Sequence, residues 1–217
     1  MALALFDLDN TLLSGDSDFL WGEFLSEQGI VDAKVYAREN QRFYEEYKSG
    51  TLDIHEFQAF SQQPLVQNDL KKMQALRTIF LSEKIQPIMS PASFKLIKKH
   101  QDQDDTLVVI TATNSFITRP IAQSFGIEHL IATEPEMIDG KYTGKVAGTP
   151  CFQDGKVTRL SHWMKQHQHD LQDSWFYSDS YNDLPLLLKV NNPVAVDADE
   201  KLLKHAKKNN WQIMSLR

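Results

Sequence analysis

Two aspartates spaced two residues apart follow an apolar segment near the start of the chain. The segment spans Ala4 to Phe6, and Asp7, Asp9 and Thr11 come directly after it. Side chains at positions i and i+2 of an extended segment share one face, so both carboxylates would lie where a buried strand meets solvent. Two such groups repel unless a proton or cation intervenes, and Mg²⁺ prefers oxygen ligands, often with a substrate phosphate. Phosphate chemistry is our first hypothesis, and an inert acidic turn capped by threonine is the alternative.

A second polar group follows the β-branched segment 107–110. Thr111, Ala112 and Asn114 come after this segment, and a helix is expected next. A hydroxyl and free backbone N–H groups before a helix N-terminus are suited to phosphate oxygens. Capping of that helix by Thr or Asn is the alternative interpretation.

A lysine and two further acids complete the set. Lys156 follows a glycine-containing turn, where its charge could offset that of a nucleophilic carboxylate and a phosphoryl group; a solvated lysine is the alternative. Asp179 and Asp183 follow the apolar segment 175–177. Asp183 also falls in a first helical turn, where the helix dipole favours an acid.

Composition limits the classes of partner. The chain has 23 basic and 29 acidic residues and a net charge of −6, and no basic stretch is interleaved with aromatics, so nucleic acid is not expected as a partner. Cys151 is the single cysteine, which excludes an internal disulfide and indicates a buried thiol. No window approaches the roughly 20 apolar residues of a membrane span, so we expect no membrane partner and a cytoplasmic location. A monomer and a homodimer both remain open.

The chain alternates short apolar runs with helical stretches, as is typical of a parallel sheet with helices on both faces. Residues 15–88 instead carry apolar residues at helical spacing. Ten aromatic residues lie between Phe19 and Phe80, so we expect an all-helical insertion with a small core of its own. The predicted strands are residues 3–6, 106–110, 129–132, 175–177 and 193–196.

The main domain is predicted to resume close to residue 90. Ser90 and Pro91 are a helix cap and a first helical residue, which gives a core domain of residues 1–14 and 89–217 around an insertion of residues 15–88. The pair at 139 and 140, Asp followed by Gly, predicts a hairpin turn.

The order of these motifs resembles the haloacid dehalogenase (HAD) superfamily in its phosphatase branch, over nearly the whole chain. The helical insertion after Asp7-x-Asp9 is similar to the cap of the phosphoserine phosphatase-like subfamily. Segments 15–21 and 111–116 resemble a bacterial histidinol-phosphatase-like group. The resemblance implies a Rossmann-like α/β core with an inserted helical cap.

The resemblance also implies a Mg²⁺-dependent phosphomonoester hydrolase. Asp7 would take the phosphoryl group as an aspartyl-phosphate, and Asp9 would act as general acid and base. Mg²⁺ would be bound by Asp7, the main-chain carbonyl of Asp9 and Asp179, with Asp183 orienting its waters.

The same resemblance assigns the phosphate-binding groups. Thr111, backbone N–H groups around Ala112, and Lys156 would hold the phosphoryl oxygens. Asn114 is a further candidate for substrate binding.

The expected substrate is a small phosphorylated metabolite. Phosphoserine phosphatases usually have an arginine in the later cap and Gly-Gly after the second motif, whereas residues 50–60 lack arginine and Ala112-Thr113 replaces the glycines. A substrate with an amine or imidazole, such as histidinol phosphate or a related amino-alcohol phosphate, fits better. Asp18 is our candidate partner for its charge, with a helix N-cap as the alternative role, and Arg119 either guides anions or is simply exposed. A phosphoserine phosphatase, a phosphotransferase and a non-catalytic phospho-ligand binder remain alternatives.

Overall fold

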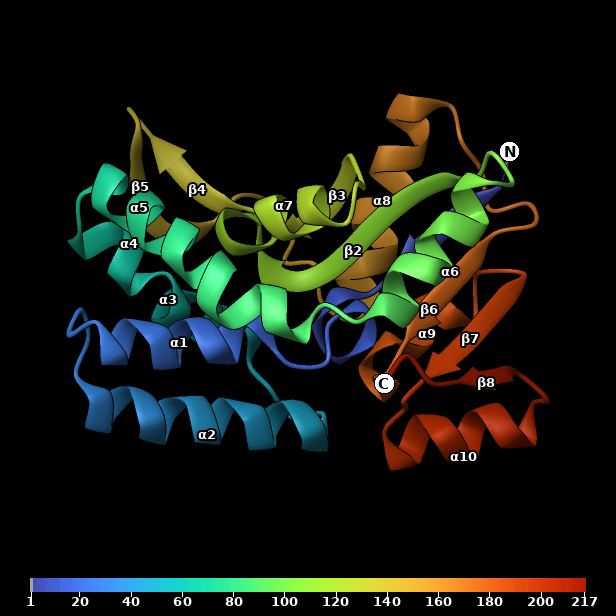
Figure 1. Ribbon diagram of the computed structural model, residues 1–217, viewed down its shortest axis with the longest axis horizontal. Coiled ribbons are helices and arrows are strands. Elements are labelled where there is room, and N and C mark those ends of the chain that lie inside the picture. Colours follow the sequence, from blue (N-terminus) through green and yellow to red (C-terminus); the bar gives the residue numbers. More distant parts are fainter. Residues whose placement is uncertain (1) are drawn as a thin grey trace.

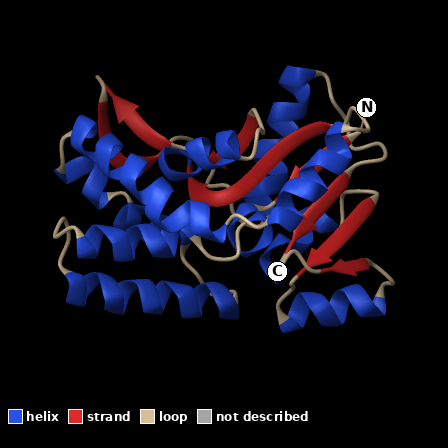
Figure 2. Ribbon diagram, in the orientation of Figure 1, coloured by secondary structure: helices blue, strands red, loops and turns tan. Residues whose placement is uncertain are grey.

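The computed structural model describes residues 2–217, and its centre is a six-stranded parallel sheet (Figures 1 and 2). The strand order is β3-β2-β1-β6-β7-β8, so the expected α/β fold with a parallel sheet is confirmed. The strands are β1 (Leu3–Phe6), β2 (Thr106–Asn114), β3 (His129–Thr133), β6 (Trp175–Ser178), β7 (Asn192–Val196) and β8 (Gln212–Met214).

Both faces of the sheet are buried because its strands carry apolar residues in both directions. In β1, Phe6 lies in the apolar cluster on one face and Leu5 in the cluster on the other. Helices α6 (Pro91–Gln101) and α7 (Ser115–Ser124) supply side chains to the Phe6 face. The Leu5 face is covered by α8 (Asp154–His167), α9 (Leu184–Leu187) and α10 (Glu200–Lys208).

Residues 17–88 are helical apart from short connections. Leu13 forms an antiparallel bridge with Met89, so the chain leaves and re-enters the sheet region at one point. The helices are α1 (Ser17–Glu27), α2 (Ala33–Ser49), α3 (Ile54–Ser61), α4 (Gln63–Gln67), α5 (Leu70–Phe80), η2 (Leu81–Ile85) and η3 (Gln86–Ile88). Aspartates at 16, 32, 53 and 69 accept backbone N–H groups at the starts of α1, α2, α3 and α5, which is the usual function of an N-cap.

The expectation that this helical region has its own core is wrong for its largest apolar side chains. Trp21, Phe24 and Phe80 belong to the same buried cluster as Phe6 of the sheet. Helix α1 contacts β2 and α7, and Phe80 of α5 packs on the rings of Trp21 and Phe24. A separate aromatic group lies further out, where the tilted rings of Phe60 and Tyr36 are 4.5 Å apart. Helical spacing identifies an apolar face but not the element that covers it.

A two-stranded hairpin extends from the sheet toward the helical region. Strands β4 (Pro135–Ile138) and β5 (Lys141–Val146) pair in antiparallel fashion, and β5 contacts α3 and α4. Asp139 and Gly140 both have positive φ angles, +51° and +75°, so the predicted turn is confirmed.

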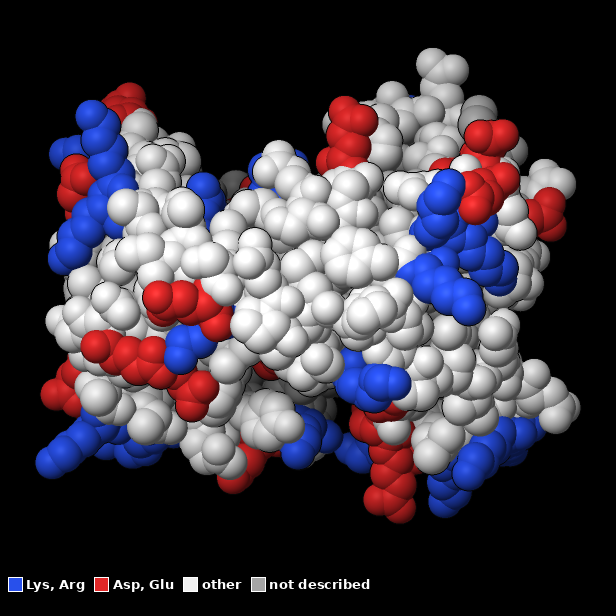
Figure 3. Space-filling view, in the orientation of Figure 1, with Lys and Arg blue, Asp and Glu red and all other residues white. Residues whose placement is uncertain are grey.

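The surface shows no single dominant charge on the face seen in Figure 3, where acidic and basic side chains are interspersed around a broad uncharged centre. Within residues 2–217, no helix combines the length and the apolar character that a bilayer crossing requires.

Candidate active site

The centre of the site is an ammonium group held between two buried carboxylates. Asp7 follows β1 directly, and its N–H donates to the carbonyl of Tyr177 in β6 at 2.9 Å, which continues the strand pairing. Lys156 Nζ lies 2.7 Å from Asp7 Oδ1 and 2.7 Å from the Asp183 carboxylate. Ser178 Oγ donates to Asp183 at 2.7 Å. Lys156 is 149 residues from Asp7 and 27 residues from Asp183 in sequence, yet its ammonium nitrogen contacts both carboxylates.

Lys156 is buried as a cation, with only 2% of its surface exposed. Burial opposes its charge, but Asp183 and Asp7 outweigh burial and raise the pKa of the ammonium. The solvated lysine considered from the sequence is thus excluded. Asp183 binds Lys156 instead of the backbone N–H groups of its helix, so the helix-dipole explanation does not account for its placement.

Glycine is required at position 155 by the close approach of another backbone segment. A Cβ at Gly155 would lie 2.0 Å from the carbonyl oxygen of Pro150. The turn before α8 can pack this tightly only without a side chain. Its tightness sets where Lys156, the next residue, enters the site.

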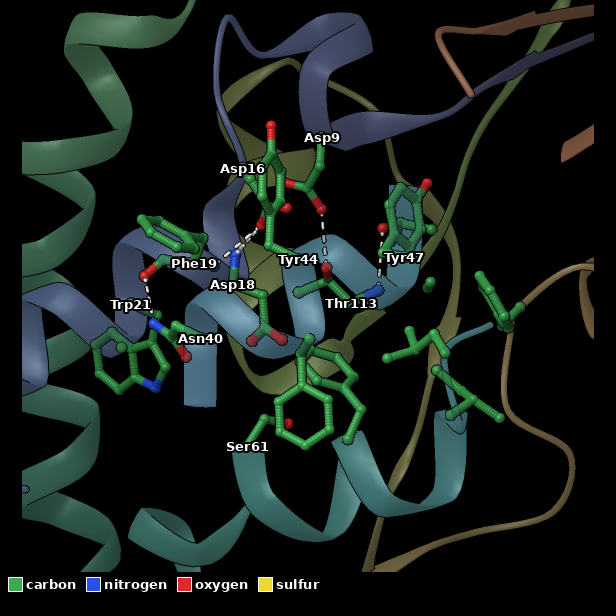
Figure 4. Close-up of a pocket in the computed structure, with 18 of the residues that line it drawn as sticks. Asp9, Asp16, Asp18, Phe19, Trp21, Asn40, Tyr44, Tyr47, Ser61 and Thr113 are labelled. Carbon is green, nitrogen blue, oxygen red and sulfur yellow. Dashed lines mark hydrogen bonds between the residues drawn. The ribbon is translucent and has the colours of Figure 1, made fainter. Parts of the chain in front are cut away.

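Asp9 is fixed by two donors from different parts of the chain. Its Oδ1 accepts from the N–H of Ser17 at 2.6 Å, and its Oδ2 accepts from Thr113 Oγ1 at 2.8 Å. Figure 4 shows Thr113 reaching Asp9 in this way. Burial and the charge of Asp16 together raise the pKa of Asp9 to about 6, against the opposing effect of the hydrogen bonds from Ser17 and Thr113. The carboxyl can therefore hold or release a proton near neutral pH.

Thr11 connects the first acidic segment to the last. Its hydroxyl lies 3.2 Å from Asp7 Oδ2 and 3.1 Å from Asp179 Oδ1, and it accepts from the N–H of Asp179 at 3.0 Å. The Thr11 hydroxyl oxygen thus lies within hydrogen-bond distance of both the Asp7 and the Asp179 carboxylates. Burial raises the pKa of Asp179 well above its usual value, and the charges of Asp7 and Asp183 add to the shift.

The end of β2 also reaches this pocket, although not with every residue expected. Thr111 and Ala112 line the pocket, and Thr111 Oγ1 accepts from the N–H of Thr113 at 3.2 Å. The side chain of Asn114 does not line it. Asn114 Oδ1 accepts from the N–H of Ile117 and caps α7, so the capping interpretation holds for this residue.

The pocket continues from the sheet into the helical region (Figure 4). Asp18 lines it, and the helix cap considered for Asp18 is wrong because Asp16 accepts from the N–H groups of Asp18 and Phe19, both at 3.0 Å. Arg119 lies outside, with 49% of its side chain exposed and a guanidinium nitrogen 3.9 Å from Glu134.

One residue between the last two acids ties the helical region to the sheet. Asn182 Nδ2 donates to the carbonyl of Tyr47 in α2 at 2.9 Å, and Asn182 Oδ1 accepts from Gln153 at 3.1 Å. The ring of Tyr47 lies 6.0 Å from that of Phe152. The wall of the pocket near Asp183 is therefore built from both parts of the chain.

The sequence reasoning missed Thr113 and Asp16 as members of the site. Thr113 was noted only as a replacement for glycine, although its place two residues after Thr111 already puts it on the same side of the extended strand. Asp16 lies three residues before the apolar run that begins at Phe19, as an N-cap ordinarily does. Neither position shows from sequence alone that it lies beside Asp9.

The donors at the sheet edge fit a hard divalent cation. Asp7 and Asp183 contact the Lys156 ammonium, and Asp179 shares the Thr11 hydroxyl with Asp7. Burial disfavours the charged form of Asp7, Asp9 and Asp179. Within residues 2–217, no three His, Cys, Asp or Glu side chains are grouped as a set of metal ligands. Two carboxylates and a main-chain carbonyl, completed by water and a phosphate, match the way Mg²⁺ is usually held in proteins.

Comparison with known proteins identifies the family. The model for haloacid dehalogenase-like hydrolases matches residues 4–188, and the chain belongs to this family. The chain is 42% identical to a histidinol-phosphatase of Neisseria meningitidis serogroup C over 219 residues, which covers 99% of both proteins.

Two solved structures share the fold of this chain. A protein of unknown function from Bordetella pertussis matches with a TM-score of 0.94 and 39% identity, covering 100% of this chain and 99% of the other. A phospho-aspartyl intermediate analogue of phosphoserine phosphatase matches with a TM-score of 0.68 and 20% identity, covering 100% and 93%. This second match shows a shared fold only.

Proposed function

We propose that this chain, a phosphatase of the haloacid dehalogenase-like family, hydrolyses a small cationic phosphomonoester in a Mg²⁺-dependent reaction, with histidinol phosphate as its substrate. The proposed reaction rests mainly on the buried Lys156 ammonium, which lies 2.7 Å from both Asp7 and Asp183. A carboxylate fixed beside a buried cation is prepared to attack an anionic phosphate. The full-length likeness to a histidinol-phosphatase supports the choice of substrate.

Asp7 acts as the nucleophile. Its carboxylate oxygen forms a bond to phosphorus while the ester P–O bond breaks, which leaves an aspartyl-phosphate. Asp9 donates its proton to the departing alcohol oxygen. Asp9 then takes a proton from the water that attacks the aspartyl-phosphate, and inorganic phosphate leaves.

Other groups balance charge during both steps. Lys156, the Thr111 hydroxyl and the backbone near Ala112 hold the phosphoryl oxygens. Asp183 holds Lys156 in place. Mg²⁺, bound by Asp7, Asp179 and the main-chain carbonyl of Asp9, would offset the repulsion between nucleophile and phosphate.

The charge of the pocket favours a cationic substrate. Among the pocket-lining residues that the structure describes, Lys156 is the only lysine or arginine. It already faces Asp7 and Asp183 and marks the phosphate end. A substrate carboxylate would find no second cation there, whereas a protonated amine would meet an excess of aspartates. Residues 15–88 are the part of the chain that would cap the phosphate end.

A substrate panel tests this proposal. With Mg²⁺ present, we expect phosphate release from histidinol phosphate, phosphoserine, ethanolamine phosphate and sugar phosphates to differ, with the highest kcat/KM for histidinol phosphate. EDTA should stop release. A preference for phosphoserine would overturn the substrate, and tight binding without release would favour a non-catalytic binder. Phosphate transferred to an added alcohol would identify a phosphotransferase.

The hydrogen bond from Thr113 to Asp9 gives a prediction about pH. This bond favours the ionised carboxylate, so Thr113→Val should raise the pKa of Asp9 above its value of about 6. Since the first step needs protonated Asp9, kcat/KM falls as pH rises through that pKa. We expect the falling limb of the kcat/KM profile to move to higher pH by roughly one unit.

Thr158→Val is the matched control for this variant. Thr158 is exposed on α8 and donates within its own helix to the carbonyl of Asp154, so its removal should leave the pH profile in place. A uniform loss of kcat/KM in Thr113→Val, with the limb unmoved, would indicate that Thr113 only supports packing.

A further inference from the structure

Four buried oxygen atoms in the helical part of the pocket have no hydrogen-bond partner in the described part of the chain. They are both carboxylate oxygens of Asp18, the hydroxyl of Tyr36 and the hydroxyl of Ser61. All three residues line the pocket, from α1, α2 and α3 respectively. In Figure 4 the Asp18 carboxylate points away from Asp9, toward the part of the pocket where Ser61 lies. The group therefore forms a second polar centre, separate from the phosphate end.

Leaving such atoms unpaired is unfavourable, and no structural role in the chain accounts for them. A buried polar group without a partner destabilises the fold, and a charged group does so more strongly. Asp18 does not cap its helix, since Asp16 does. Burial and the charges of Asp16 and Asp9 all raise the pKa of Asp18, and no neighbour lowers it. Among residues 2–217, Asp18 thus has no cationic partner.

Aromatic rings form the walls around this polar centre. The ring of Phe60 lies 4.5 Å from Tyr36 and 5.4 Å from Phe43, and Phe43 lies 5.3 Å from Phe57. These four residues line the same pocket. Aromatic faces attract a cation, most strongly where water is excluded, so the walls and the carboxylate favour the same kind of guest.

We infer that Asp18, Tyr36 and Ser61 form the subsite that recognises a protonated nitrogen group of the substrate, a primary ammonium or a protonated imidazole. This inference rests on the proposed function, because it requires the phosphate to occupy the end of the pocket at Asp7 and Lys156. The N–H groups of the cation donate to the Asp18 carboxylate, and the Tyr36 and Ser61 hydroxyl oxygens accept from its remaining N–H groups. An anionic group at this end would be repelled by Asp18 and Asp16.

Asp18→Asn tests the subsite with substrates that differ in charge. Ethanolamine phosphate and propyl phosphate differ by an ammonium in place of a methyl group, and histidinol phosphate carries both an amine and an imidazole. For the better of the two cationic substrates, we expect kcat/KM to fall roughly 30-fold or more, as for other buried charge pairs that lose one partner. For propyl phosphate the loss should stay below about threefold, because the phosphate end is untouched.

Asp32→Asn is the matched control. Asp32 caps α2 at the surface through the N–H groups of Lys34 and Val35, and asparagine caps helices equally well. This variant removes the same charge from the same helical region and should leave both kinds of substrate unaffected. Tyr36→Phe should raise KM for the cationic substrate several-fold and leave propyl phosphate unchanged.

Thermal stability separates recognition from a structural role. Because Asp18 has no partner without substrate, Asp18→Asn should keep or raise the Tm. A clear fall in Tm, or equal losses on cationic and neutral substrates, would overturn the subsite. If the unmodified chain released phosphate from no monoester, the proposed function itself would fail. If the unmodified chain released phosphate but Asp18→Asn lowered kcat/KM equally for cationic and neutral substrates, only the subsite would be overturned.

Discussion

Asp7→Asn is expected to reduce phosphate release by roughly 10⁴-fold or more, as removal of a catalytic nucleophile commonly does. The amide cannot form the acyl phosphate, whatever substrate is bound. The fold should survive, because the N–H of Asp7 still donates to Tyr177 and Lys156 keeps its second partner, Asp183. Burial raises the pKa of Asp7 to about 7, so a neutral side chain is readily accommodated there.

Asp139→Asn provides the control for this variant. Asp139 is exposed in the β4–β5 turn with a φ of +51°, a conformation that asparagine also tolerates. Phosphate release should be measured with Mg²⁺ for both variants, and folding by circular dichroism and thermal melting. Activity in Asp7→Asn within tenfold of the unmodified chain would exclude Asp7 as the nucleophile.

Lys156→Met is expected to lower both activity and stability. Removal of the ammonium leaves Asp7 and Asp183 buried without a counter-charge, and breaking a buried pair in this way costs roughly 3–5 kcal/mol. For a chain of this size that corresponds to a fall in Tm of roughly 6–20 °C. Loss of charge stabilisation at the phosphoryl group should reduce kcat by at least roughly 100-fold.

The stability loss should depend on pH in a defined direction. Removal of Lys156 raises the folded-state pKa of Asp7, which burial already raises to about 7. A carboxyl with a raised folded pKa destabilises the fold as it ionises, so the deficit should be small near the unfolded pKa of about 4 and largest above pH 7. Melting curves from pH 4 to 8 measure this trend.

Two further variants complete this experiment. Lys165→Met removes an exposed lysine from the same helix and should leave the Tm unchanged. Asp183→Asn in the Lys156→Met background should recover part of the lost stability, because it removes one of the two unpaired carboxylates. A Lys156→Met variant as stable as the unmodified chain at pH 8 would contradict the buried charge pair.

The sheet and the acids at its edge could be predicted from the sequence because their signals are local. The apolar run before Asp7 and the β-branched run before Thr111 identify strands, and β1 lies at the expected residues. The expected end of β2 at residue 110 is wrong, because the strand continues to Asn114. The last strand, β8, was missed. It has three residues, Gln212–Met214, and Ile213 is exposed, so it lacks the apolar run that marks a buried strand.

Details of the site depend on contacts that sequence spacing does not encode. Asp16 and Asp18 both precede apolar residues, and only the path of the chain decides that Asp16 caps the helix while Asp18 faces the pocket. Thr113 contacts Asp9 because β1 and β2 pair in one particular register. The core that the sheet shares with the helical region could not be predicted from spacing either, because it depends on how α1 and α5 pack.

The position of Asn182 has a consequence for how the pocket can be entered. The four-residue interval from Asp179 to Asp183 supplies the acids at the sheet edge, and Asn182 within it holds the carbonyl of Tyr47 at the end of α2. Any outward swing of α2 that admits a ligand must break this bond. Access for the ligand and the alignment of the last two acids are therefore coupled through this amide side chain.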